Sequence, residues 1–201
     1  MSKNLFLPKA VFYETATFEF TSQLEANWQT IRRELSQLRQ GDFIAWPEKY
    51  LYGKGWDIFG LYAFGIKVAA NCSLCPETTR LVEAIPNLVT AGFSSLIPGT
   101  HIAPHNGYPD GLLRCHLGLT VPPGCGIRVG HEVRVWEEGK CLVFDDTAEH
   151  EAWNKGETTR VVLLLDFKAP PGLLSSPPQD ADRAKEKGKG LGSVLNFFKK
   201  K

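Results

Sequence analysis

The first part of the chain carries a helical pattern of hydrophobic positions. Between about residues 18 and 41, apolar side chains recur at steps of four, three, four and three with charges between them: Leu24, Trp28, Ile31, Leu35 and Leu38. Ser22 followed by Glu25 predicts a capping box, and Gly41 predicts the end of this helix. A second, short helix is expected after Pro76, over the sequence PETTRLVEA. The first half is therefore expected to be at least partly helical.

From Ala91 onward the hydrophobic period changes from 3.6 to 2. Six β-rich runs follow between clusters of Gly, Pro and Asp: GFSSLI, LLRCHLGLTV, CGIRVG, VRVW, KCLVF and TRVVLLLDF. Gly130-His131-Glu132 predicts a tight hairpin. Short strands at this spacing favour an antiparallel sandwich or barrel. The predicted fold class is mainly β, with helices flanking the β core on its N-terminal side.

The composition changes again near residue 170. We expect one domain over residues 1–170 and a flexible tail over 171–201, because a stretch rich in Pro, Gly, Ser and Lys cannot bury enough apolar surface to fold alone. The final LGSVLNFFKKK would place four apolar side chains on one helical face before three lysines: Leu191, Val194, Leu195 and Phe198. A frayed terminus and a weak membrane-surface or partner helix are both open interpretations.

Composition and charge narrow the class of protein. The chain has 201 residues, of which 43% are hydrophobic and 22% charged, which excludes a disordered chain and allows one full core. Lys+Arg 23 against Asp+Glu 22 leaves a formal charge of +1, so no overall field attracts nucleic acid. No transmembrane segment or secretory leader is evident, and five cysteines are an odd number. We therefore expect a cytoplasmic protein.

Cys72 and Cys75 have CxxC spacing without a second pair, which favours structural cysteines over a metal or redox site.

Two basic residues share one face of the run LLRCHLGLTV. Strand alternation places Leu113, Cys115 and their neighbours on one side, and Arg114 and His116 on the other. A solvated outer face is the simpler interpretation, and an internal binding face is the alternative.

The run TRVVLLLDF is apolar on both faces, which indicates a strand covered on both sides. Arg160, near its start, therefore needs an anion or a polar pocket. Its planar guanidinium suits a carboxylate or phosphate ligand. A structural salt bridge with Asp145, Asp146 or Glu149 is equally compatible with the sequence.

Histidines flank the basic strand in sequence. His101 and His105 fall in PGTHIAPHNG, expected as a loop, and His150 falls in FDDTAEHEAWN, directly after a strand. Neutral imidazoles on two such loop ends can bind Fe(II), Mn(II) or Zn(II). A ten-residue hairpin return from His150 would bring Arg160 onto the same internal face. That arrangement would hold a metal and an anionic co-substrate side by side.

The block from Gly92 to Pro170 closely resembles the catalytic domain of the aspartyl/asparaginyl β-hydroxylase family of Fe(II)/2-oxoglutarate dioxygenases. The matching stretches, in order, are PGTHIAPHNG, LRCHLGLTVP, GCGIRVG, WEEGKCLVFDD and HEAWNKGETTRVVLLLDF. Weaker similarity extends upstream through LEANW and GWDIFGLY. The resemblance implies a double-stranded β-helix, a jelly-roll or cupin-like core, that uses Fe(II), 2-oxoglutarate and O₂.

The resemblance also implies roles for individual residues. His105 and His150 would ligate the metal, and Arg160 would pair with the distal carboxylate of 2-oxoglutarate. Further co-substrate contacts would come from Ser94, Arg114 and His116, with Trp56 as an additional contact. Trp136 and Trp153 are interpreted as packing residues.

Most non-haem iron oxygenases have a carboxylate two residues after the first histidine, where this chain has Gly107. The β-hydroxylase branch similarly has glycine there and fills the position with water. From the residues alone, Asp110 or Asp145 could supply a third ligand.

The implied reaction is hydroxylation of a C–H bond, and the leading expectation for its substrate is the β-carbon of Asp or Asn in a peptide or protein. The animal enzymes of the family carry a substrate-facing Arg where this chain has Leu112, which weakens the case for an aspartyl substrate. A lipid or small-molecule substrate is one alternative. A non-catalytic barrel that binds an anion or a metal is another, because a fold does not establish a function.

Overall fold

The computed structural model describes residues 10–107 and 111–173. Its helices are α1 (Glu19–Ala26), α2 (Trp28–Gln37), α3 (Ala69–Leu74) and α4 (Pro76–Glu83), with short 3-10 turns η1 (Thr15–Thr17), η2 (Gln40–Asp42) and η3 (Lys49–Leu51). The strands are β1 (Phe12–Tyr13), β2 (Ile44–Ala45), β3 (Trp56–Ala63), β4 (Ile66–Lys67), β5 (Leu88–Leu96), β6 (His101–His105), β7 (Leu112–Thr120), β8 (Cys125–Val129), β9 (Glu132–Arg134), β10 (Cys141–Asp145), β11 (His150–Asn154) and β12 (Arg160–Lys168). The predicted apolar face within LGSVLNFFKKK lies outside the described residues.

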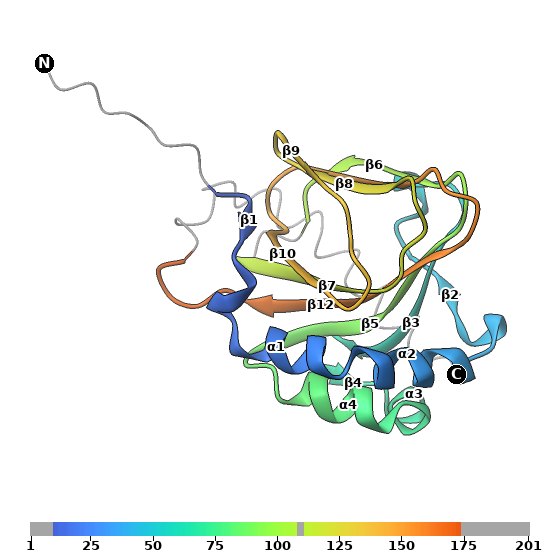
Figure 1. Cartoon of the computed structure of the whole chain (residues 1–201), viewed down its shortest axis with the longest axis vertical. Helices are drawn as coiled ribbons and strands as arrows, with labels where there is room; N and C mark the ends of the chain where they lie inside the picture. The colour runs from blue at the N-terminus through green and yellow to red at the C-terminus, as the bar shows by residue number, and fades with distance from the viewer. Residues whose placement is uncertain (1–9, 108–110, 174–201) are drawn as a thin grey trace, which may run out of the picture.

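Two antiparallel sheets face each other. Within the described ranges, the large sheet has the strand order β1-β10-β7-β12-β5-β3-β2, with β4 beside β3, and the small sheet has the order β6-β11-β8-β9. The helices cover the outer face of the large sheet, on the side away from the small sheet (Figure 1). From β5 to β12 the chain alternates between the two sheets, with only the β8–β9 hairpin staying in the small sheet, as in a jelly roll. The predicted double-stranded β-helix with flanking N-terminal helices is confirmed.

The large sheet is buried on both faces. On β7, Leu113, Leu117 and Leu119 pack into the apolar layer beneath the helices. On β12, Leu163 belongs to this same layer, whereas Val162 faces a second layer between the two sheets. Strand alternation therefore separates a helix-side core from a barrel interior, as the two-sided apolar pattern of TRVVLLLDF predicts.

The long N-terminal helix expected from the sequence is two helices. The chain breaks at Asn27, whose side-chain amide donates to the carbonyl oxygen of Gln23 at 2.8 Å and whose backbone leaves the helical region (φ −109°, ψ 8°). Such side-chain competition for backbone groups interrupts helices. The predicted capping box is wrong because Ser22 lies inside α1, and the predicted end at Gly41 is wrong because α2 ends at Gln37.

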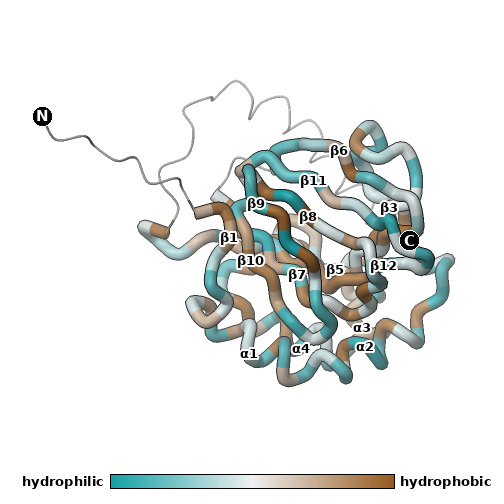
Figure 2. Tube along the Cα trace, turned by 45° about the horizontal axis from the view of Figure 1, so that its top comes forward, coloured by the Kyte–Doolittle hydropathy of each residue, from teal (hydrophilic) through white to brown (hydrophobic). Residues whose placement is uncertain are grey.

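The two histidine segments expected as loops are strands. β6 and β11 pair with each other, and β11 also pairs with β8. Figure 2 shows both as largely hydrophilic tube, in contrast to the brown stretches on the large sheet. These two segments lack apolar alternation, so their sequence does not indicate strands. Their strand conformation comes from pairing, of β6 with β11 and of β11 with β8. β3 is a further strand that the sequence pattern did not indicate.

The cysteines are packing residues in this structure. All five thiols are buried and none is in a disulfide. Burial raises the pKa of the Cys75 thiol to about 12, so it does not form a thiolate at neutral pH. Cys72 and Cys75 therefore belong to the apolar core, as the structural interpretation of the CxxC spacing expects.

In the part of the chain that the structure describes, no helix is both long and apolar enough to cross a membrane.

Ile31 is fully buried where α2 packs on the helix-side core. We expect Ile31→Ala to lower the free energy of unfolding by about 3 kcal/mol, because it removes buried methyl groups and leaves a cavity. Urea unfolding followed by circular dichroism measures the change. The control is Ile66→Ala, at a side chain that is 45% exposed. An equal loss for both variants would contradict the packing described for α2.

Candidate functional site

One narrow cavity between the two sheets is lined by all seven residues that the sequence singled out: Trp56, Ser94, His105, Arg114, His116, His150 and Arg160. They come from β3, β5, β6, β7, β11 and β12, so both sheets contribute. Apolar side chains, including Ile102, Ile127 and Phe144, complete the wall. The solvated outer face considered for Arg114 and His116 is excluded, because both are buried.

His105 and His150 lie opposite each other on adjacent strands of the small sheet. They are register partners on β6 and β11, and their ring centroids are 4.2 Å apart. Each Nδ1 contacts the carbonyl oxygen two residues earlier, of Ala103 at 2.8 Å and Ala148 at 2.9 Å. A carbonyl only accepts, so each Nδ1 carries the proton and each Nε2 keeps its lone pair.

Burial keeps both imidazoles neutral. It lowers the pKa of His105, and it lowers the pKa of His150 to about 3 with a further contribution from His105 nearby. The Nε2 atom of His150 is buried without a hydrogen-bond partner in the described chain, and Asp146 Oδ1 lies 3.6 Å from it. Two neutral, inward-facing imidazole nitrogens are suitable metal ligands.

Arg160 is a buried cation without a carboxylate. Its side chain is among the largest that are fully buried, and no described Asp or Glu forms an ion pair with it. Its guanidinium lies 4.5 Å from the Trp136 ring centroid, its Nη1 is 3.5 Å from the Ser94 carbonyl oxygen, and its Nε has no partner. Burial lowers its pKa to about 10, which leaves it charged at neutral pH. The salt bridge proposed as its structural role is absent from the described residues.

Two further donors point into the same cavity. Trp136 Nε1 donates to His116 Nδ1 at 3.2 Å, which places the His116 proton on Nε2, a buried atom with no partner of its own. Trp56 Nε1 donates to Ser94 Oγ at 3.0 Å, so the Ser94 hydroxyl proton remains available. Because burial lowers the pKa of His116 well below its usual value, this ring is a neutral donor.

Arg114, in contrast, has two carboxylate partners. Its Nε and Nη2 donate to Asp166 at 2.6 and 3.0 Å, and its Nη1 lies 2.9 Å from Asp146 Oδ1. This ion-pair network connects β7, β12 and the turn before β11. Arg114 lines the cavity, but its charge is already balanced, so Arg160 is the cation that still needs a partner.

Gly107 has a steric reason to be glycine. Its backbone N–H donates to the Asp146 carbonyl oxygen at 2.8 Å, and an added Cβ would overlap the Asp146 carboxylate. No three His, Cys, Asp or Glu side chains group as a metal site within residues 10–107 and 111–173. Of the alternative third ligands, Asp145 accepts hydrogen bonds from Thr147 in the turn, and Asp110 lies outside the described residues.

The structure brings His150 and Arg160 to one cavity by a different route from the predicted hairpin. β11 and β12 belong to opposite sheets, so the hairpin prediction is wrong. The connection crosses the barrel, and both side chains face its interior. The sequence favours mainly a packing role for Trp136. Its contacts with Arg160 and His116 show that it orders two cavity donors, and nothing in the local sequence indicates this role.

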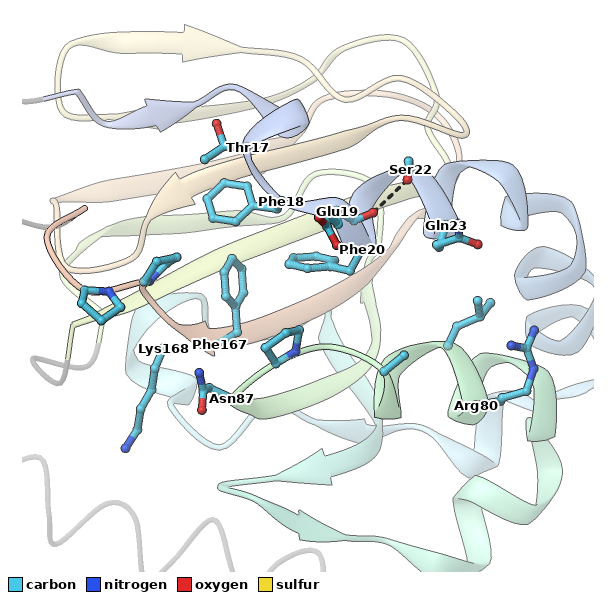
Figure 3. Close-up of a pocket in the computed structure, with 15 residues that line it drawn as sticks. Thr17, Phe18, Glu19, Phe20, Ser22, Gln23, Arg80, Asn87, Phe167 and Lys168 are labelled. Atoms are coloured by element: carbon cyan, nitrogen blue, oxygen red, sulfur yellow. Dashed lines mark hydrogen bonds between the residues drawn. The ribbon is translucent and has the colours of Figure 1, made fainter.

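A larger groove of about 750 Å³ lies elsewhere, beside α1 and α4 (Figure 3). Phe18, Phe20 and Phe167 form its aromatic base, and Arg80 and Lys168 lie on its edge. None of the histidines lines it. The convergence of buried donors and imidazoles therefore identifies the smaller inter-sheet cavity as the candidate site.

The described chain is therefore a jelly roll with two facing histidines and a buried arginine that has no carboxylate partner among the described residues. The family model for aspartyl/asparaginyl β-hydroxylase matches residues 25–170, and the chain belongs to this family of hydroxylases. The match includes all seven cavity residues and ends at the predicted domain boundary.

Two curated relatives differ in what their names describe. The ornithine lipid ester-linked acyl 2-hydroxylase of Rhizobium tropici is 43% identical over 176 residues, which cover 82% of this chain and 62% of that protein. The human aspartyl/asparaginyl β-hydroxylase is 38% identical over 168 residues, which cover 78% of this chain and 22% of that protein. The chain thus spans less than two thirds of either relative.

Among solved structures, a prolyl hydroxylase in complex with a hypoxia inducible factor peptide fragment, from Trichoplax adhaerens, aligns with a TM-score of 0.52. The alignment covers 71% of this chain and 78% of that one at 13% sequence identity. At this identity the likeness concerns the fold alone, and it agrees with the β-helix described above.

Gly107→Ala tests the contact with Asp146. We expect a loss of about 2 kcal/mol in the free energy of unfolding, because the new methyl group must displace the Asp146 carboxylate or backbone. Chemical denaturation measures it. At Gly41 an added Cβ would meet no heavy atom within 4 Å, so Gly41→Ala is the matched control. Unchanged stability in Gly107→Ala would contradict this geometry.

Burial of His116 makes the stability of the folded state sensitive to acid. The folded state holds His116 neutral, whereas the unfolded chain protonates it below about pH 6.5, so the folded state loses stability as the pH falls through this range. The limiting slope is about 1.4 kcal/mol per pH unit for one histidine. We expect His116→Asn to lose stability less steeply between pH 6.5 and 5 in urea titrations. Parallel pH profiles for the variant and the wild type would refute this.

Proposed function

We propose that this chain is an Fe(II)- and 2-oxoglutarate-dependent hydroxylase that uses O₂ and acts on an unactivated C–H bond. The observation that carries the proposal is the pairing, in one cavity, of two inward imidazole nitrogens with an unpaired buried cation, Arg160. A buried guanidinium without an anion is costly, and a bound dicarboxylate would remove that cost.

The donor set fits both groups. His105 and His150 would hold the metal through Nε2, since each Nδ1 is already committed to a backbone carbonyl. When bound, Fe(II) with 2-oxoglutarate and O₂ supplies the oxidising chemistry that converts a C–H bond into an alcohol. Arg160 would pair with the distal carboxylate of 2-oxoglutarate, and the Ser94 hydroxyl and the His116 Nε2–H would donate to its oxygens.

The chain's own residues also orient the co-substrate and exclude water. Trp136 covers the Arg160 guanidinium and fixes the His116 tautomer, and Trp56 orients the Ser94 hydroxyl. These donors are held before ligand binding, which limits the entropy lost on binding. The Arg114 network holds the turn that precedes His150, so in this proposal Arg114 acts by positioning.

Two substrate classes agree with the family. The family description favours the β-carbon of Asp or Asn in a peptide or protein. The name of the Rhizobium relative favours an acyl chain of a lipid. Leu112, buried on the same face of β7 as Arg114, provides no charge for an aspartyl carboxylate, and Arg114 is already paired. We therefore place an acyl chain or a neutral asparaginyl side chain ahead of an aspartyl side chain.

The test separates metal binding from anion binding. With Mn(II) in place of Fe(II), we expect Arg160→Met to weaken 2-oxoglutarate binding at least about tenfold through loss of a charged hydrogen bond, and His150→Ala to abolish metal-dependent binding. Calorimetry measures both. With Fe(II), succinate release from 2-oxoglutarate should occur in the wild type and disappear in both variants.

Arg80→Met, which removes an exposed arginine paired with Glu77, is the control and should bind as the wild type does. If the wild type does not bind 2-oxoglutarate, the proposal is wrong. Binding without succinate release across lipid and peptide substrates would instead identify a non-catalytic barrel.

A further inference from the structure

A short segment between β2 and β3 reaches the mouth of the cavity. It contains Trp46, Glu48 and Tyr50, and its 3-10 turn η3 packs against β6, the strand that ends at His105. Trp46 and Glu48 line a small crevice together with His105, Gly107 and Arg114. A molecule approaching the two histidines from this crevice would therefore pass Glu48.

Glu48 is a carboxylate without a cation. It is half-buried, and its oxygens accept hydrogen bonds from Trp46 Nε1 at 3.2 Å and from the Tyr50 hydroxyl at 3.0 Å. No described Lys or Arg forms an ion pair with it, although Lys49 is adjacent in sequence. Two neutral donors hold the carboxylate in place and leave its charge unbalanced.

The two aromatic rings add to the attraction for a cation. Trp46 is stacked on Trp56, with ring centroids 4.5 Å apart and planes 9° from parallel, so its position is fixed. Tyr50 is 77% exposed, so its ring is accessible to a molecule at the crevice. A carboxylate between aromatic rings favours an ammonium group through charge and cation–π attraction.

Apolar side chains also contribute to the wall of the cavity behind this crevice. Leu112 is only 4% exposed on the inward face of β7, and Ile102, Phe144 and Leu164 contribute to the cavity wall. Arg114 is occupied by Asp146 and Asp166, so it is not available to a substrate carboxylate. The crevice is thus anionic and aromatic, and in the cavity behind it apolar side chains share the wall with the buried donors.

We propose that Glu48, with Trp46 and Tyr50, is a binding subsite for the primary ammonium group of an amphiphilic substrate whose alkyl or acyl chain extends toward His105 at the cavity mouth. This inference rests on the proposed hydroxylase function and specifies its substrate class. Glu48 binds the charged end and thereby selects cationic amphiphiles over neutral or acidic ones.

The test uses two probes that differ only in the charged group. N-(4-aminobutyl)dodecanamide carries an ammonium group where N-pentyldodecanamide carries a methyl group. Calorimetry below the micellar concentration, with Mn(II) and 2-oxoglutarate present, gives both dissociation constants. We expect the wild type to bind the ammonium probe about tenfold more tightly.

Glu48→Gln keeps the side-chain shape and an acceptor oxygen, and it should bind the two probes equally. Glu157→Gln is the control. It removes an exposed carboxylate in the β11–β12 connection, which starts at the end of β11 away from His150, so the variant should keep the tenfold ratio. A purely structural role for Glu48 would weaken both probes by the same factor and keep their ratio, which would overturn the proposal. So would equal binding of the two probes by the wild type.

A peptide pair, acetyl-Gly-Lys-Gly-amide and its norleucine counterpart, tests the other source of an ammonium group. If the lysyl peptide binds as tightly as the amphiphile and depends equally on Glu48, the amphiphile assignment is wrong. Binding of 2-oxoglutarate is measured before any probe is added. Its absence would refute the hydroxylase proposal, whereas a failed probe ratio with normal 2-oxoglutarate binding would refute only the ammonium subsite.

Discussion

The buried ion pairs of Arg114 organise the interior of the barrel. Its guanidinium bridges Asp166 on β12 and Asp146 in the turn before β11, and all three side chains are almost completely buried. Removing charges from water costs several kcal/mol each, and only close geometry with several hydrogen bonds offsets this cost. The network therefore restricts where β7, β12 and the turn can lie. It also balances one of the two interior arginines and leaves Arg160 available.

This division between the arginines follows from strand alternation in a sheet covered on both faces. Helices bury the outer face of the large sheet, so its outward positions must be apolar, and the inward positions can carry polar groups only if these have partners. His116 Nε2, His150 Nε2 and Arg160 Nε are buried and have no partner in the described chain. Their concentration in one cavity supports the proposal that ligand atoms complete their hydrogen bonding.

Backbone carbonyls and one indole set the chemistry of these groups. The carbonyls of Ala103 and Ala148 fix the protons of the two facing histidines on Nδ1, and the Trp136 indole fixes that of His116 on Nε2. Identical side chains thus become electron-pair donors on one sheet and a hydrogen-bond donor on the other. In the proposed function, the environment of each imidazole, rather than the residue type, separates the metal ligands from the anion donor.

Local patterns in the sequence correctly predicted the strands with strong alternation, the short helix after Pro76 and the two-sided burial of β12, because each depends on local periodicity. They also showed that Arg160 needs an anion or a polar pocket, because burying a charge is costly. Strand alternation and the placement of the histidines singled out His105, Arg114, His116, His150 and Arg160, and the family resemblance assigned their roles and added Ser94 and Trp56. Other features are visible only in the folded chain: β6 and β11 are strands, α1 and α2 separate at Asn27, and β11 and β12 lie in opposite sheets. The same is true of which arginine is paired and of which tautomer each histidine adopts. These features depend on contacts between residues far apart in sequence, such as Arg114 with Asp166 and Trp136 with His116, which local patterns do not encode.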